Sequence, residues 1–192
     1  NARVRHLYSP SPRFSHSSLL ADNDLTSNGL AVVAVHGKGA DPVVVGNRIH
    51  DGKAAGIFVY EGGRGRFEDN DVFANAGAGI EVREGADPVV VGNRIHDGKQ
   101  SGVLVQKNGR GRLENNDVFG NKFAGIEVRG GADPVVVGNR IHDGKQTGIF
   151  VQKNGRGRFE NNDVFGNTGA GVTVTEGGDP VVVNNRIRNN SY

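Results

Sequence analysis

Apolar residues recur along the chain with two spacings. One set alternates with polar residues at every second position, as in Ile57 and Val59 or Ile80 and Val82, which predicts short strands with one buried face. The other set returns every 23 residues in two columns: Val44, Phe67, Val90, Leu113, Val136, Phe159 and Val182, and Ile49, Val72, Ile95, Val118, Ile141, Val164 and Ile187. Helical spacing is absent, so the pattern predicts an all-β protein.

The chain is also an internal repeat. Residues 85–130 and 131–176 agree at 36 of their 46 positions, and each block divides into two similar halves of 23 residues. A flat unit of this length cannot bury its apolar edge alone, so successive units must stack at the strand spacing of about 4.8 Å. We therefore expect a single-stranded, right-handed parallel β-helix of about eight coils over residues 19–192, with the last coil incomplete. Residues 1–18 break the repeat and are expected to form an N-terminal cap or linker.

Each coil carries one asparagine at the same turn, and stacked amides can hydrogen-bond along the axis. This structural ladder comprises Asn23, Asn47, Asn70, Asn93, Asn116, Asn139, Asn162 and Asn185. Charged columns alternate in sign from coil to coil, as in Arg48, Asp71 and Arg94, and we expect them to form ion pairs that fix the register. A second alternating column begins with Asp41 and Arg64.

Three histidines, His50, His96 and His142, are separated by two coils each, or about 9.6 Å, which is too far for one shared metal ion. Their column alternates with phenylalanines, so the sequence predicts a stacked surface stripe of His50, Phe73, His96, Phe119, His142 and Phe165. The chain has no cysteine, which excludes disulfides and thiol nucleophiles. No cofactor, metal or catalytic residue is expected.

The net charge is only +2, and the arginines of the GRGR segments have aspartates in their column, so we expect no nucleic-acid partner. No apolar run has the length of a membrane span, and residues 1–16 lack the apolar stretch of a secretory signal. The absence of cysteine fits an intracellular location, which is favoured over secretion. Because the chain starts with Asn1 and stops at Tyr192 in mid-pattern, we expect it to be a fragment of a longer protein.

The outward side of the alternating strand is the predicted partner-binding face. It combines aromatic, aliphatic and charged residues: Phe58, Tyr60, Glu81, Arg83, Leu104, Gln106, Glu127, Arg129, Phe150 and Gln152. The core does not require Phe58, Leu104 or Phe150 there, which indicates an interface unless these side chains only cover one another. Glu81 and Glu127 also point outward, but their separation is at the outer limit for a paired-carboxylate glycosidase.

Several segments resemble a known repeat family. The phrases NRIHDGKQ, G-V-x-V, NGRG, ENNDVF and AGIEVR resemble the carbohydrate-binding and sugar-hydrolase type of β-helix repeat. Over residues 20–190 the chain looks most like the F-box-only β-helix proteins, substrate receptors of cullin-based ubiquitin ligases. The resemblance implies a substrate-docking solenoid, although the chain shows neither an F-box nor the Cys/His pattern of the zinc finger that can follow such repeats.

Three functions follow as expectations. The favoured one is a non-enzymatic module that presents its rigid strand face to a protein partner, such as the substrate-recognition part of a ubiquitin-ligase receptor. The alternative is a carbohydrate-binding or polysaccharide-modifying β-helix of lyase, epimerase or hydrolase type. The third is a purely structural spacer. The open strand edge of the last coil predicts either end-to-end self-association or a continuation of the chain beyond Tyr192.

Overall fold

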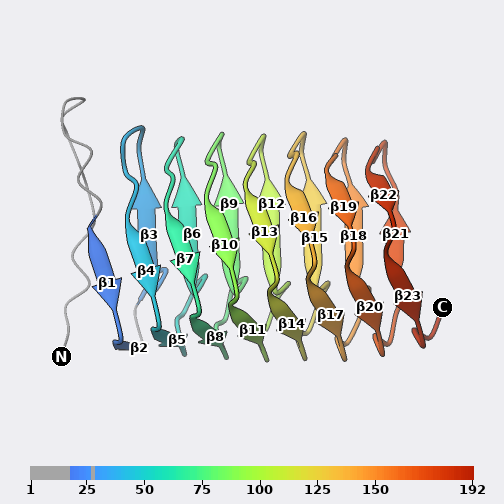
Figure 1. Cartoon of the computed structure of the whole chain (residues 1–192), viewed down its shortest axis with the longest axis horizontal. Helices are drawn as coiled ribbons and strands as arrows, with labels where there is room; N and C mark the ends of the chain where they lie inside the picture. Colours follow the sequence, from blue (N-terminus) through green and yellow to red (C-terminus); the bar gives the residue numbers. More distant parts are fainter. Residues whose placement is uncertain (1–17, 27–28) are drawn as a thin grey trace.

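The computed structural model describes residues 18–26 and 29–192, and this part of the chain forms 23 short strands and no helix. The strands belong to three parallel sheets that run along one axis, and each coil contributes one strand to each sheet (Figure 1). There are seven complete coils and two strands of an eighth. The predicted parallel β-helix is confirmed, including its incomplete last coil.

The three sheets are numbered here in the order in which a coil visits them. Sheet I contains β1 (Leu19–Ala21), β4 (Val43–Val45), β7 (Arg66–Glu68), β10 (Val89–Val91), β13 (Arg112–Glu114), β16 (Val135–Val137), β19 (Arg158–Glu160) and β22 (Val181–Val183). Sheet II contains β2 (Asp24–Thr26), β5 (Arg48–His50), β8 (Asp71–Phe73), β11 (Arg94–His96), β14 (Asp117–Phe119), β17 (Arg140–His142), β20 (Asp163–Phe165) and β23 (Arg186–Arg188). Sheet III contains β3 (Val33–His36), β6 (Ile57–Tyr60), β9 (Ile80–Arg83), β12 (Val103–Gln106), β15 (Ile126–Arg129), β18 (Ile149–Gln152) and β21 (Val172–Val174).

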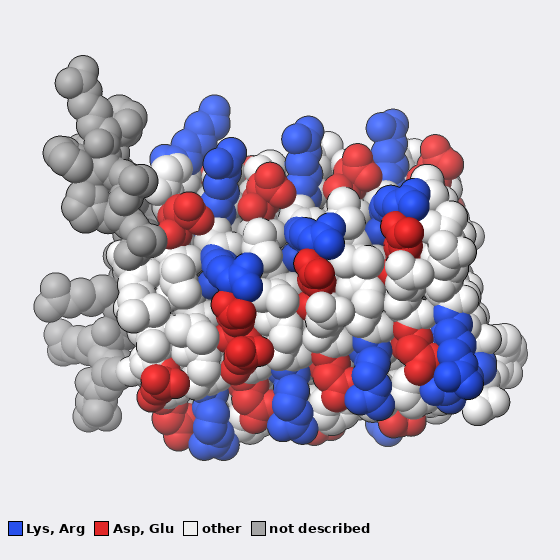
Figure 2. Space-filling model, in the orientation of Figure 1, with Lys and Arg blue, Asp and Glu red and all other residues white. Residues whose placement is uncertain are grey.

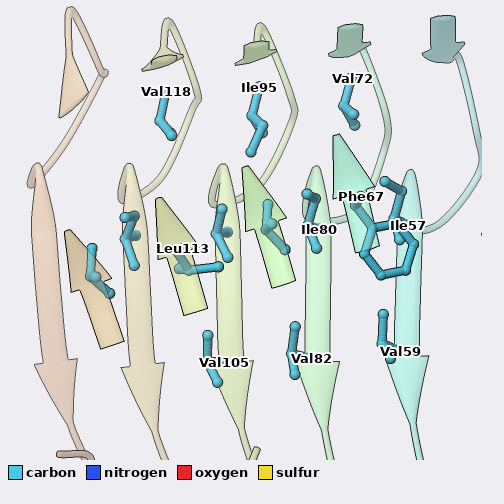
Figure 3. Close-up of a cluster of buried hydrophobic side chains, with 14 of the residues drawn as sticks. Ile57, Val59, Phe67, Val72, Ile80, Val82, Ile95, Val105, Leu113 and Val118 are labelled. Atoms are coloured by element: carbon cyan, nitrogen blue, oxygen red, sulfur yellow. The ribbon is translucent and has the colours of Figure 1, made fainter. Parts of the chain in front are cut away.

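The core is the stack of inward-pointing residues. The middle residue of each short strand in sheets I and II points inward, and two residues per strand do so in sheet III. Phe67, Val72 and Ile80 are fully buried members of one coil, and like residues lie over like residues in the next coils (Figure 3). In the last coil Val182 and Ile187 are 38% and 47% exposed, because no further coil covers them in the described chain.

The asparagine ladder has the predicted geometry. The backbone N–H and side-chain Nδ2 of Asn70 both donate to Oδ1 of Asn93, one coil on, at 2.9 Å. The same Nδ2 also donates to the carbonyl oxygen of Val44 at 2.9 Å. From Asn47 to Asn162 the ladder residues are at most 2% exposed, so these bonds satisfy amides that water does not reach.

A second ladder lies five residues further along each coil. Asn75, Asn121 and Asn167 occupy it in every second coil, with Gly52, Gly98 and Gly144 in the alternate coils, and Asn190 follows Asn167 in the next coil. The backbone N–H of Gly52 donates to Oδ1 of Asn75 at 2.9 Å, and a Cβ on Gly52 would lie 2.6 Å from Cγ2 of Val32. The sequence analysis did not find this ladder, because an asparagine returns only every 46 residues over most of it.

The histidine and phenylalanine column of sheet II forms the predicted stack. Ring centroids of neighbours from His50 to Phe165 lie 4.6 to 5.3 Å apart with nearly parallel planes. Both ring nitrogens of His50 lie 2.7 Å from carboxylate oxygens, Nε2 from Asp24 and Nδ1 from Asp51. His96 and His142 are held by equivalent aspartate pairs. No group of three or more potential ligands among the described residues is arranged to hold a metal ion.

We expect the contribution of His50 to stability to depend on pH. Burial by itself lowers the pKa of His50, but hydrogen bonds to Asp51 and Asp24 outweigh it, so the pKa is raised above 6.5. The resulting stabilisation is complete below the unfolded-state value of 6.5 and is lost as the pH rises through the folded-state pKa. Urea unfolding between about pH 5.5 and 9 gives the free energy of unfolding of the wild type and of His50→Gln. The difference between the two free energies should become smaller as the pH rises above 6.5. A difference in free energy of unfolding that does not change with pH would contradict the stabilising role of protonated His50.

The charged columns only partly follow the prediction. Arg48, Arg94 and Arg140 pair with the aspartate of the preceding coil at 3.2 to 3.4 Å, as expected. The second column was predicted wrongly: Arg64, Arg110 and Arg156 have no ion pair within 4 Å in the described chain, because they project from exposed turns into solvent. Sheet I instead carries pairs within single strands, such as Arg66 with Glu68 at 2.7 Å. Figure 2 shows basic and acidic side chains alternating along the axis on an otherwise uncharged face.

Two expectations concern the ends of the chain and the membrane. The predicted cap of residues 1–18 lies, except for Ser18, outside the described residues. End-to-end association stays a prediction. No described segment forms a helix long and apolar enough to cross a membrane.

Candidate functional site

The outward face of sheet III brings together all ten residues of the predicted partner-binding face. Strand pairing places Phe58 beside Glu81, Glu81 beside Leu104, and Arg83 beside Gln106. The same register continues through Glu127 to Phe150 and through Arg129 to Gln152. These side chains are half-buried and lie along the sheet, so they form a continuous surface of two columns.

In the middle coils this surface is a closed hydrogen-bond network. Oε1 of Glu127 accepts from Arg129 and from Gln152, both at 3.0 Å, and Oε2 accepts from the hydroxyl of Ser101 at 2.9 Å. Nε of Arg129 donates to Oε1 of Gln106 at 3.0 Å. Both carboxylate oxygens of Glu127 and two nitrogens of Arg129 are thus already engaged within the protein.

The equivalent pair two coils earlier, Glu81 and Arg83, is open. Gln106 donates to Oε1 of Glu81 at 2.8 Å. The position equivalent to Ser101 is Ala55, which has no hydroxyl group. Oε2 of Glu81 therefore accepts no hydrogen bond from the described residues. Arg83 lies 3.7 Å from Glu81 and 3.2 Å from Glu84 without donating a hydrogen bond to a described residue, and its buried Nε has no partner of good geometry. Glu81 and Arg83 therefore make fewer hydrogen bonds within the described chain than Glu127 and Arg129, although Arg83 keeps ion pairs with Glu81 and Glu84.

Aromatic residues of the first two coils surround Arg83. Its guanidinium lies 4.5 Å from the ring centroid of Phe58 and 5.8 Å from that of Tyr60. The ring of Tyr60 stacks on Phe58 at 4.4 Å and on His36 at 4.9 Å, and Nδ1 of His36 lies 3.5 Å from Oε2 of Glu61. We call His36, Phe58, Tyr60, Glu81 and Arg83 the His36–Arg83 cluster.

The cluster is one of the places where the outward face departs from the repeat. Tyr60 stands where later copies have Gln106 and Gln152, and His36 stands in the column position of Arg83 and Arg129. Tyr60 belongs to the face predicted from the strand period, whereas His36 does not, because a one-residue insertion after this strand shifts the register of the first coil. A search for departures from the repeat on the outward strand face could have found it.

This arrangement provides three chemical groups on a rigid sheet. A guanidinium that donates no hydrogen bond within the described chain can bind a carboxylate. The phenol of Tyr60 beside it and the imidazole of His36, which stacks on the far side of Tyr60, can transfer protons, and Oε2 of Glu81 can accept a hydrogen bond from a hydroxyl group. These are the groups that a reaction at a carbon next to a carboxylate requires.

Solved structures with the same fold include alginate epimerases. The A-module of mannuronan C-5 epimerase AlgE6 from Azotobacter vinelandii is 18% identical with a TM-score of 0.72, over 88% of this chain and 57% of that one. The A-module of mannuronan C-5 epimerase AlgE4 from the same organism is 19% identical with a TM-score of 0.65, over 90% and 56%. The periplasmic alginate epimerase AlgG is 14% identical with a TM-score of 0.69, over 85% and 43%. The chain spans about half the length of each.

These findings correct the favoured functional prediction. The structures that the chain resembles are epimerases of a polysaccharide, which contradicts a non-enzymatic module for protein partners and supports the polysaccharide alternative. The likeness to F-box-only ubiquitin-ligase receptors has no support here. The error arose because repeat phrases record the scaffold, which unrelated functions share. At identities of 14 to 19% the structural likeness likewise establishes the fold alone.

No curated protein shows significant sequence similarity to the chain. The family model described as "Right handed beta helix region" matches residues 13–133 and 102–192, which together include most of the sequence. The chain belongs to this right-handed β-helix family.

Proposed function

We propose that this protein acts on an acidic polysaccharide and that the His36–Arg83 cluster is its reaction site. The proposed reaction class is proton abstraction from the carbon next to a uronate carboxylate, followed by reprotonation or elimination. The observation that carries the proposal is Arg83, which forms ion pairs with Glu81 and Glu84 but donates no hydrogen bond of good geometry to a described residue. Its guanidinium lies over the ring of Tyr60, and His36 stacks on the same ring, and both residues break the repeat. The epimerase activity of structures with the same fold supports this substrate class.

The chemistry needs a cation because removal of a proton next to a carboxylate leaves extra negative charge on its oxygens. Arg83 can neutralise that charge while Glu84 and Glu81 keep its guanidinium in place. Tyr60 and His36 are the candidates for removing and returning the proton. Delivery of a proton to the opposite face of the carbon gives the epimer. Alternatively the bond from the adjacent carbon to the glycosidic oxygen breaks, that oxygen takes up a proton and leaves as the hydroxyl of the departing chain, and an unsaturated sugar remains.

The test is incubation of the protein with polymannuronate and, separately, polygalacturonate. Proton NMR of the anomeric region detects a newly epimerised sugar, ultraviolet absorbance detects an unsaturated chain end, and affinity electrophoresis measures binding. Either product supports the proposal. Binding to a polyuronate without any product would favour the carbohydrate-binding alternative and remove the catalytic proposal.

Tyr60→Gln restores the residue that later copies carry at this position, so the fold should tolerate it. We expect it to lower kcat about 100-fold with little change in KM, because a proton-transferring group is lost. Gln152→Tyr adds a tyrosine to the same column four coils away and should leave the rate unchanged. Equal rates for wild type and Tyr60→Gln would exclude a role for Tyr60 in the reaction.

A further inference from the structure

Three lysines lie over one another in the turns that join sheet II to sheet III. Lys99, Lys122 and Lys145 occupy the same turn position in three successive coils, and the backbone N–H of each donates to a carbonyl oxygen of the preceding coil at 2.9 to 3.0 Å. Stacked coils are about 4.8 Å apart, so the Cα atoms of the three lysines form a row with this spacing. All three side chains are exposed.

This row departs from the charge pattern of the rest of the molecule. The Arg48 column alternates with aspartates, which removes repulsion between neighbouring coils. Here three successive coils carry the same sign, and none of the three lysines forms an ion pair within 4 Å in the described chain. The self-repulsion costs stability, and a bound polyanion would relieve it.

The residues that follow the lysines have a composition that suits sugars. Gln100, Phe123 and Gln146 form the adjoining column, all three exposed, and Phe123 is a large apolar side chain at 39% exposure. An aromatic ring can pack against the apolar face of a pyranose, and side-chain amides can bind hydroxyl groups. The first copy of the repeat has Ala54 at this place and lacks the aromatic and amide groups.

We propose that Lys99, Gln100, Lys122, Phe123, Lys145 and Gln146, here called the Lys–Phe patch, bind an acidic polysaccharide strand running along the axis. The patch lies in the fourth to sixth coils, whereas the His36–Arg83 cluster lies in the first three. It is therefore a second contact for a chain that extends beyond the reaction site. The choice of a polyuronate rests on the proposed function, but binding to the patch does not require that the reaction occurs.

The test compares two triple variants of equal charge change. Lys99→Gln/Lys122→Gln/Lys145→Gln should weaken binding of polymannuronate about tenfold at low salt and flatten the salt dependence of its affinity. Arg64→Gln/Arg110→Gln/Arg156→Gln removes three unpaired, exposed turn cations on the other edge of sheet III and should change affinity less than about twofold. Phe123→Ala should weaken binding several-fold without altering the salt dependence.

Affinity electrophoresis and calorimetry with polymannuronate, neutral mannan and single-stranded DNA give the readout. Loss of polymannuronate binding in the lysine triple variant alone supports the patch, whether or not the wild type turns the polymer over. Equal losses in both triple variants would indicate a non-specific effect of net charge and overturn the proposal. Wild-type affinity in the lysine variant, or DNA bound as tightly as polymannuronate, would also overturn it.

Discussion

Arg83→Gln is expected to reduce turnover of an acidic polysaccharide by about 100- to 1000-fold, the usual cost of removing one preorganised donor from developing charge. The fold should tolerate the exchange, because half-buried Arg83 makes no hydrogen bond to the described residues and loses only ion pairs with Glu81 and Glu84 and its contact with the Phe58 ring. The variant should show a lower kcat and weaker binding of a carboxylate-bearing substrate. Its affinity for neutral polymers should equal that of the wild type. Steady-state kinetics with polymannuronate would measure it.

The repeat supplies a matched control for this variant. Arg129 occupies the same column two coils later but already donates to Gln106 and Glu127. Arg129→Gln should therefore lower stability slightly and leave kcat near the wild-type value. If both variants lost activity equally, the His36–Arg83 cluster would not be the reaction site.

Asn116→Ala is expected to lower the free energy of unfolding by about 2 to 5 kcal/mol, a large change for one exchange. Oδ1 of Asn116 accepts from the backbone N–H of Asn93 at 3.0 Å, and its Nδ2 donates to the carbonyl oxygen of Val90 at 3.0 Å. Alanine leaves both backbone groups buried without these partners. Urea unfolding, with hydrogen exchange to locate the opened coils, would measure the loss.

The control is Arg112→Ala on the outside of the same coil. Arg112 pairs with Glu114 at 2.7 Å in solvent, where such pairs contribute about 0.2 to 1 kcal/mol. The ladder variant should be clearly less stable than this one. Similar unfolding midpoints would show that water or neighbouring asparagines replace the lost bonds.

Much of the fold could be predicted because the same pattern of residues occurs again in every coil. A position such as Asn70 or Phe73 can be compared with the equivalent positions one and two coils away. Only one stacking register places equivalent residues directly over one another at the strand spacing. The second asparagine ladder was not predicted, because glycine fills alternate positions over most of its length. The ion pairs of Arg64 were predicted wrongly because column position does not determine where an exposed turn side chain points.

The candidate site could be predicted only in part. Phe58, Tyr60, Glu81 and Arg83 were placed on one face from the strand period, but the same reasoning treated Glu127 and Arg129 as their equals. The contacts show which sequence differences matter, since Ser101 satisfies Glu127 whereas Ala55 leaves an oxygen of Glu81 without its counterpart bond.

The sequence by itself determined the coil length, the stacking register and the inward and outward faces of this protein, because these depend on periodic burial of apolar side chains and asparagines. The tertiary structure decided which polar groups of the outward face remain available. Hydrogen bonds between neighbouring coils depend on side-chain reach and direction, which periodicity does not specify. The same repeated residues are therefore closed into a network around Glu127 and open around Arg83.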